Sequence, residues 1–175
     1  MGWDERFFAL FDDLEQQAEG LALEERDLEV AERARAEYAA VDLVARLHGS
    51  LGAELTVRVD GIGLFRARLA RVGADFVVLD ATSQLWVVPA GALLGITGLT
   101  LRATGEAARP ITARLGLRSV LRGMAEAGDE VTVHRRGTDP VSGRIGRVGA
   151  DFVEVGDEVL PLAAIAGVRS DYSAG

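Results

Sequence analysis

The chain of 175 residues contains no cysteine, no lysine and no asparagine, and only two histidines. Without cysteine it has no disulfide framework, no thiolate metal site and no cysteine nucleophile. His48 and His134 are too few for a histidine-rich zinc or iron site. All of the basic residues are arginine, which we attribute to the codon bias of a GC-rich, bacterial genome. We expect no metal and no cofactor.

The sequence also lacks an uninterrupted apolar segment of membrane-spanning length. Residues 81–101 carry no charge over about the length of a spanning helix, but Pro89 and three glycines interrupt them. The N-terminus has no basic stretch followed by an apolar run, as a signal peptide would have. We therefore expect a cytoplasmic protein that does not enter a membrane.

Negative charge is concentrated near the N-terminus, although the whole chain has a formal charge of −8. Residues 1–45 hold 13 acidic residues and four arginines, a net charge of −9. Residues 102–150 hold nine arginines and five acidic residues, a net charge of +4. A locally basic surface is therefore expected on an acidic protein.

One seven-residue string occurs twice. Residues 71–77 read RVGADFV, and residues 147–153 repeat the string without change. At average residue usage, such a match arises by chance with a probability of roughly 10⁻⁴ over the chain. The same offset of 76 places residues 52–57 over residues 128–133, until four residues are missing from the second copy after Val155. The chain is therefore an internal duplication of one small β-rich unit.

Hydrophobic periodicity predicts the elements of each copy. Apolar residues three and four apart predict helices over residues 3–19, 22–47 and 110–126. Alternating apolar and polar residues predict strands over 55–59, 65–70, 76–79, 85–88 and 93–99, with counterparts over 131–133, 141–145, 152–155, 159–160 and 165–168. Turns are expected at residues 60–63 and 137–140.

The repeated aspartates, Asp75 and Asp151, admit two readings. Each follows Gly-Ala at an expected bend and precedes a strand, which favours a carboxylate that caps the turn. A repeated catalytic acid pair is the alternative. Neither histidine has a partner motif for general-base catalysis, and no nucleophile, phosphate-loop or metalloprotease motif is present. We expect that the protein is not an enzyme.

Three stretches of the first copy carry a resemblance to a known fold: GLFRARL at 63–69, VGADFVVL at 72–79 and VVPAGALLGI at 87–96. A helix followed by five short, strongly bent antiparallel strands resembles the Sm-like family, and both copies match, over about residues 35–100 and 110–170. SH3-like and PRC-type barrels are alternatives of similar size. The resemblance implies an α+β fold with an N-terminal helical segment and two tandem bent five-stranded antiparallel barrels, each preceded by a helix.

These expectations divide the chain into five parts: an acidic helical leader (1–49), a first Sm-like barrel (50–101), a linker and basic helix (102–127), a second barrel (128–170) and a tail (171–175). A barrel of about 50 residues has a marginal core of its own. We therefore expect the two barrels to pack together or to be completed by neighbouring chains.

Members of the Sm-like family commonly form rings by pairing strand edges, and they bind RNA on the ring face. The resemblance thus implies a homo-oligomer or an internal pseudo-dimer, with RNA as a candidate partner. This chain departs from the family where the bacterial RNA chaperones carry a Tyr-Lys-His type motif, because it has Val88-Pro89-Ala90 there. It also has no asparagine for the third-strand loop. No RNA-contacting residue is carried over.

Two sets of arginines are candidate contacts to nucleic acid or to an acidic partner. Arg114, Arg118 and Arg122 recur at helical spacing and could bind phosphates, although ion pairs with the acidic leader are the favoured reading. Arg58, Arg66 and Arg68 share one strand face, for which a solvated sheet surface is the favoured reading.

Aromatic side chains are clustered in the leader. Trp3, Phe7, Phe8 and Phe11 lie so close together that they must pack on the barrels or on another copy of the chain. We predict a non-enzymatic assembly and binding protein of Sm-like type that associates with RNA or an RNA–protein complex. The alternative is a protein-interaction scaffold or oligomerisation module without nucleic-acid binding, which uses the leader and the strand edges.

Overall fold

The computed structural model describes residues 20, 23 and 26–171. The chain divides into two compact units, residues 1–42 and 43–175, and each is treated by itself. The predicted helix over residues 3–19 lies outside the described residues, as do Trp3, Phe7, Phe8 and Phe11.

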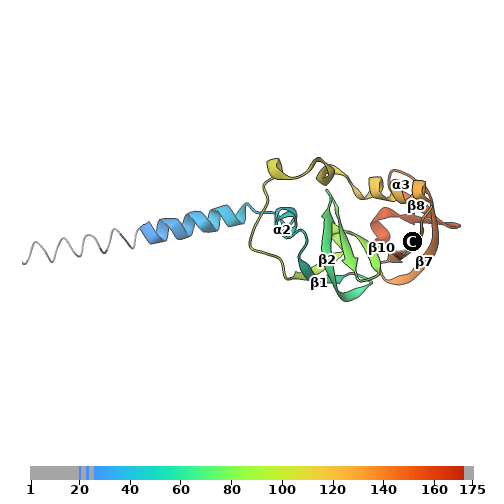
Figure 1. The fold of residues 1–175 in the computed structure, drawn as a ribbon, viewed down its shortest axis with the longest axis horizontal. Helices are drawn as coiled ribbons and strands as arrows, with labels where there is room; N and C mark the ends of the chain where they lie inside the picture. The colour runs from blue at the N-terminus through green and yellow to red at the C-terminus, as the bar shows by residue number, and fades with distance from the viewer. Residues whose placement is uncertain (1–19, 21–22, 24–25, 172–175) are drawn as a thin grey trace, which may run out of the picture. The chain divides into compact units, whose positions relative to one another are not determined.

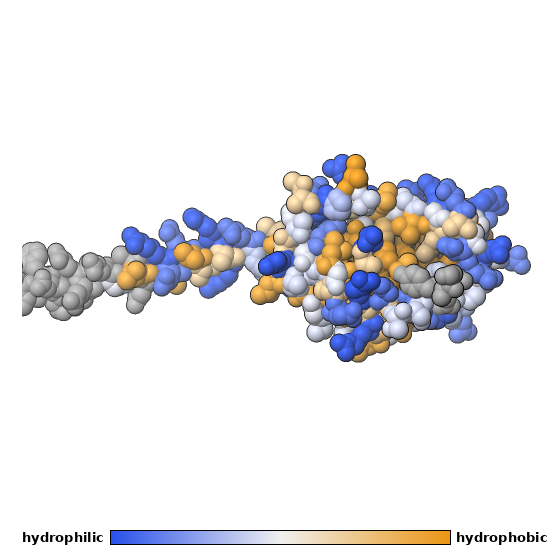
Figure 2. Space-filling view, in the orientation of Figure 1, coloured by the Kyte–Doolittle hydropathy of each residue, from blue (hydrophilic) through white to orange (hydrophobic). Residues whose placement is uncertain are grey.

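In the first unit, the described residues form a helix over residues 26–39. Leu28, Val30 and Tyr38 are exposed on it, so hydrophobic and charged side chains both face solvent along this helix (Figure 2). The prediction of one continuous helix over 22–47 is wrong, because residues 40–42 are not helical. Asp42 directly precedes the next helix, α2 (Leu43–Gly49), and aspartate favours such a capping position over a helix interior.

The second unit is built on ten strands in one antiparallel sheet (Figure 1). The first copy contributes β1 (Glu54–Val59), β2 (Gly63–Val72), β3 (Phe76–Ala81), β4 (Gln84–Pro89) and β5 (Leu93–Thr97). The second copy contributes β6 (Glu130–Arg135), β7 (Thr138–Val148), β8 (Phe152–Val155), β9 (Glu158–Pro161) and β10 (Ile165–Asp171).

The strand order repeats and confirms the duplication. The sheet runs β5-β1-β2-β3-β4-β10-β6-β7-β8-β9, so each copy places its fifth strand beside its first. The copies meet where β4 pairs with β10. The α+β class is confirmed, but the sheet is open, and no pairing between described strands closes either half into a barrel.

Each half of the sheet has its own hydrophobic core, and β4 serves both. Trp86 and Val88 belong to the first cluster, whereas Val87, between them, belongs to the second. Successive side chains of a strand point to opposite faces, so one strand can bury residues in two cores. The two copies are therefore in contact through a strand that contributes to both cores.

The repeated string forms the same bend in both copies. The amide of Gly73 donates to the carbonyl oxygen of Phe76 at 2.8 Å, and Gly149 donates to Phe152 at 2.9 Å. A Cβ atom at either glycine would collide with the phenylalanine ring that follows. Glycine is therefore required because the ring of the next strand folds back over it.

The segment between the copies is less helical than predicted. It contains two short 3₁₀ turns, η2 (Glu106–Ala108) and η3 (Ile111–Arg114), before α3 (Leu117–Ala127). The helix therefore begins at Leu117, not near Pro110, and Pro110 instead directly precedes η3. α3 ends before its C-cap residue, Gly128, which has the left-handed conformation typical of that position (φ 72°).

The predicted turn at residues 137–140 is shorter in the structure. β7 already begins at Thr138, so Pro140 lies within a strand. The pairing of β6 with β7 shifts register between Val133 and Arg135, opposite this proline. A proline inside a strand is tolerated at such an irregularity, where a ladder hydrogen bond is missing.

The start of α3 depends on a residue of the first copy. Its own N-cap residue, Gly116, has no side chain for capping. The carboxylate of Asp75 instead accepts a hydrogen bond from the amide of Leu117 at 2.7 Å. Asp151 lies exposed at the equivalent bend of the second copy. In the hydrogen bonds described, no residue between 26 and 171 donates to its carboxylate. Identical strings thus place their carboxylates in different environments.

This difference makes a matched pair of variants informative. Asp75→Ala removes a helix cap and should lower the free energy of unfolding by about 1 kcal/mol. Asp151→Ala removes an exposed side chain with no such role and should change it by less than about 0.5 kcal/mol. Urea denaturation of the three proteins measures both values, and equal losses in the two variants would contradict the assigned cap.

Candidate assembly interface

The contact between the two copies, here called the repeat joint, is a strand-edge pairing. β10 lies antiparallel to β4, and four residue pairs are in register: Val168 with Val87, Arg169 with Trp86, Ser170 with Leu85, and Asp171 with Gln84. On its other edge β10 pairs with β6 of its own copy. The joint therefore makes two five-stranded halves into one continuous sheet.

Trp86 anchors the repeat joint. Its ring lies 5.3 Å from the ring of Phe65 and 5.0 Å from the ring of His134 in the second copy. The guanidinium carbon of Arg169 lies 6.0 Å from the centre of the Trp86 ring, within the range of a cation–π contact. Aromatic rings at these separations contribute beyond their buried area.

Gly167 allows this close packing. A Cβ atom at this position would lie 2.8 Å from Cδ1 of Ile62 and 3.5 Å from Cε3 of Trp86. The first copy therefore fills the space over Gly167 with its own side chains. A side chain at position 167 would therefore require Ile62 to move.

The first turns of the two copies also meet at the repeat joint. Asp60 and Arg136 occupy equivalent positions in the duplication and form an ion pair at 3.4 Å. Both side chains are more than one third exposed, so this pair contributes little to stability. It orients the copies, whereas the ladder and Trp86 hold them together.

His134 is the titratable group at the centre of the repeat joint. Burial lowers the pKa of its imidazole below the ordinary value of 6.5, and the positive charge of Arg169 lowers that pKa further. Its Nε2 atom is buried and has no hydrogen-bond partner among the described residues. The neutral form of the ring is therefore the one that the joint accommodates.

The two ends of the sheet differ from each other. At one end, β5 is the counterpart of β10, and its outer edge has no strand partner among the described residues. At the other end, β9 is the counterpart of β4 but is two residues shorter. Glu158 occupies the position of Trp86, and its carboxylate pairs with Arg135 at 2.5 Å.

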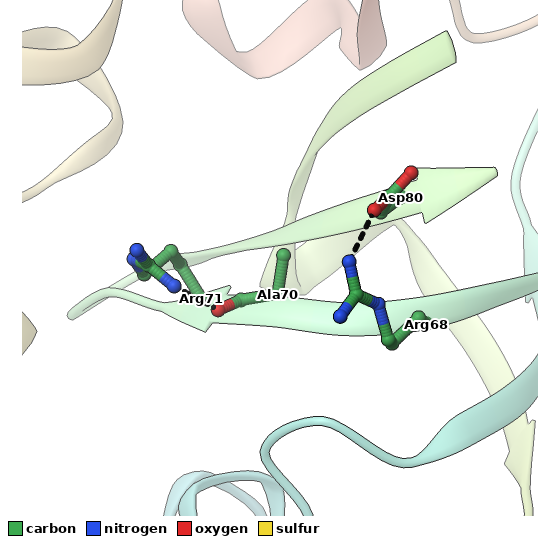
Figure 3. A network of polar contacts seen from close by, with 4 residues as sticks. All are labelled: Arg68, Ala70, Arg71 and Asp80. Atoms are coloured by element: carbon green, nitrogen blue, oxygen red, sulfur yellow. Dashed lines mark hydrogen bonds and ion pairs between the residues drawn. The ribbon is translucent and has the colours of Figure 1, made fainter. Parts of the chain in front are cut away.

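Arg58, Arg66 and Arg68 lie on one face of the paired strands β1 and β2. Arg66 lies opposite Thr56, and Arg58 lies opposite Leu64, on adjacent strands. Arg68 is bound to Asp80 at 2.7 Å, so its charge is paired (Figure 3). Arg58 and Arg66 are exposed and form no ion pair with a carboxylate whose position is described.

Arg71, which begins the first repeated string, is not part of the arginine face formed by Arg58, Arg66 and Arg68. Its guanidinium donates to the carbonyl oxygen of Ala70 at 2.8 Å (Figure 3). Its counterpart Arg147 pairs with Glu154 at 3.1 Å. These two arginines therefore serve local structure within their own copies.

The predicted helical row of Arg114, Arg118 and Arg122 is wrong in one member. Arg114 ends η3, while the other two lie one turn apart on α3. The row breaks because α3 begins at Leu117, where Asp75 caps it. Arg118 donates to the carbonyl oxygen of Ala150 at 3.3 Å, and within residues 43–171 none of the three forms an ion pair in the described contacts.

Sequence reasoning did not single out the residues that build the repeat joint. Trp86 and Gly167 were interpreted only as parts of predicted strands, Arg169 lies just beyond the strand predicted over 165–168, and His134 was considered only as a possible general base. A signal was present, because Trp86 has Glu158 as its counterpart and the four missing residues fall beside it. Differences between otherwise similar copies mark positions where their surroundings differ.

Comparison with known proteins adds no relative. No model of a known protein family matches the chain, and no curated protein matches its sequence.

The described residues show no membrane span and no metal cluster. No helix among them is both long and apolar enough to cross a membrane. Within the same part of the chain, no three His, Asp or Glu side chains are grouped as metal ligands would be.

The position of His134 predicts a pH-dependent stability. Because its pKa is lowered in the folded protein, the unfolded chain takes up a proton more readily. The stability contributed by the neutral ring is present above the unfolded pKa of about 6.5 and is lost as the pH falls through the lower folded value.

A His134→Phe variant tests this linkage. It keeps a ring against Trp86 but cannot titrate, so its free energy of unfolding should fall less than that of the parent between pH 7.5 and 5.5. Denaturant titrations at several pH values measure the difference, and His48 is common to both proteins. Parallel pH profiles would show that His134 is not the linked group.

Proposed function

We propose that this chain is a non-enzymatic assembly and binding protein built from two Sm-like units. Each half of the sheet has a helix before five strands, in α2 and α3, and both halves share one strand order. Five of the nine strand pairings contain a register shift, and such irregularities bend strands as small barrels require. These features support the assignment of each half of the sheet to a bent, Sm-like unit.

The observation that carries the proposal is the pairing of β4 with β10. The family resemblance implies that separate chains pair through strand edges. In this protein a fourth strand and a fifth strand of successive copies pair within one chain. The duplicated protein is thus an internal pseudo-dimer, and the outer edge of β5 is available for further pairing.

The polar residues that attract a catalytic interpretation have structural surroundings. Asp75 caps α3, and His134 packs on Trp86. A general base requires a positioned partner and access to a substrate. Their roles in packing favour binding over catalysis as the purpose of this fold.

An assembly protein should form more than its own internal pair. Light scattering coupled to size-exclusion chromatography is expected to give a mass above that of one chain, rising with concentration. The helix of residues 26–39, with its exposed apolar side chains, is the second candidate contact. Deleting residues 1–42 and measuring the mass again separates the two contributions. A mass of one chain at every concentration, for the full-length protein, counts against assembly by copies of this chain.

RNA binding is the second candidate function, and one observation favours it. Arg58 and Arg66 are exposed on one face of the sheet and lack a described carboxylate partner. Diagonal neighbours on adjacent strands lie roughly 7–8 Å apart, and arginine is well suited to phosphate oxygens. Ser142 and His134 replace them in the second copy, so this free arginine pair is confined to the first.

RNA binding can be tested with a double variant and a matched charge control. Arg58→Glu with Arg66→Glu should weaken binding to a labelled single-stranded RNA at least tenfold. If two phosphate contacts are lost, the slope of log K against log salt should decrease by about 1.4. Arg118→Glu with Arg122→Glu makes the same change in net charge on α3 and should leave that slope nearly unchanged. Fluorescence anisotropy at several salt concentrations measures both effects, and an absence of binding at low salt removes the RNA candidate.

A further inference from the structure

In the first copy β5 takes the place that β10 takes in the second, although β5 is two residues shorter and ends before the counterparts of Ser170 and Asp171. Ile96 and Thr97 occupy the positions of Val168 and Arg169, which face β4 across the joint. β5 pairs with β1 on its inner side, as β10 pairs with β6. On the outer side of β5, no described strand takes the place that β4 takes beside β10.

The β5 edge lacks two features that commonly prevent strand pairing, charged side chains and proline, although its pairing with β1 contains one register shift. Edge strands are usually protected by charged side chains, proline or very short length. Residues 93–101 carry no charge and no proline, and Leu94 is 62% exposed. A shallow groove of about 240 Å³ lies beside the strand and is lined by Leu43, Leu93, Leu94, Gly95, Ile96 and Leu99.

The β9 edge, in contrast, is unsuited to take the role of β4 against a second chain. In the first copy the β3–β4 hairpin continues beyond the pair of Leu79 and Trp86 by two more pairs, which contain Leu85 and Gln84. In the second copy the equivalent pair, Val155 and Glu158, is the last before the turn. β9 therefore lacks counterparts of Leu85 and Gln84, which are two of the four β4 residues that pair with β10 across the repeat joint. A charged, ion-paired glutamate also replaces the anchoring tryptophan.

We propose that two copies of this chain dimerise by pairing β5 with β5 of the second copy, antiparallel about a two-fold axis. The proposal rests on the proposed assembly function and names its partner and its edge. A second chain offers two terminal strands, and β9 is disfavoured by its charged, ion-paired Glu158. Self-pairing of β5 brings no like charges together, and two-fold symmetry is the commonest in homo-oligomers.

The geometry of the sheet fits this arrangement. Every strand pairing described in the chain is antiparallel, as a two-fold axis across two β5 edges requires. Leu94 of each chain would be covered by the leucine-lined groove of the other. A ladder of five residues is small for a permanent interface, so the dimer forms reversibly and its population depends on concentration.

The absence of cysteine from the chain allows a clean cross-linking test. Leu94→Cys on β5 and Val159→Cys on β9 each place one thiol at an exposed apolar position of a terminal strand, 62% and 59% exposed respectively in the parent. With a short bis-maleimide reagent, Leu94→Cys alone should give a covalent dimer. Val159→Cys alone should remain at the mass of one chain.

A second pair of variants tests the same edge without a cross-linking reagent. Leu94→Lys places one charge from each chain in the proposed interface and should raise the dimer dissociation constant at least tenfold. Val159→Lys is the matched control and should leave it unchanged. Because both parent side chains are exposed, neither variant should alter the thermal unfolding midpoint. Sedimentation equilibrium over a range of concentrations gives the dissociation constants.

The outcomes separate this inference from the proposed function. An oligomer that is cross-linked only when the two cysteine variants are mixed would mean head-to-tail pairing of β5 with β9, and it would overturn the two-fold arrangement alone. An oligomer with no cross-link through Leu94→Cys would also overturn it and would leave assembly intact. A single-chain mass for the parent, with no cross-link, would overturn both the two-fold dimer and assembly by copies of this chain.

Discussion

The pairing of β4 with β10 is the contact on which the second unit depends. A copy of about 50 residues buries too little surface to be stable alone. Through this pairing β4 contributes Val88 to one core and Val87 to the other, so neither core is complete without the strand they share. The repeat joint is therefore part of the fold itself, and the two copies should unfold as one cooperative body.

Identical sequence does not give identical roles in this protein. The string RVGADFV makes the same bend twice, with the same glycine amide and phenylalanine carbonyl bonded together. Asp75, however, meets the start of α3, because a second copy follows the first. No residue between 26 and 171 donates a described hydrogen bond to the carboxylate of Asp151. The bend is encoded locally, whereas the function of its carboxylate depends on what the chain places beside it.

Much of the fold could be predicted from local patterns, and the exceptions are non-local. Alternation located the strands, and the repeated glycines located the bends. The start of α3 could not be predicted, because Asp75 lies 42 residues before the amide that it caps. The same error placed Arg114 on a helix face that does not include it. The arginine pair at Arg58 and Arg66 was predictable because strand parity is a local property, but the pairing of Arg68 with Asp80 required the register.

The asymmetry between the copies explains how a duplicated sheet can stop growing at one end. If both copies were identical, β9 would offer the same edge as β4, and each chain could add to the next without limit. Non-closing head-to-tail contacts of this kind produce filaments. In the second copy the hairpin of β8 and β9 is shorter, and Glu158 stands at the position that Trp86 has in the first copy. β9 therefore does not offer the edge that β4 offers. The edge of β5 has no such protection, so any pairing that it makes with a second copy of itself closes after two chains.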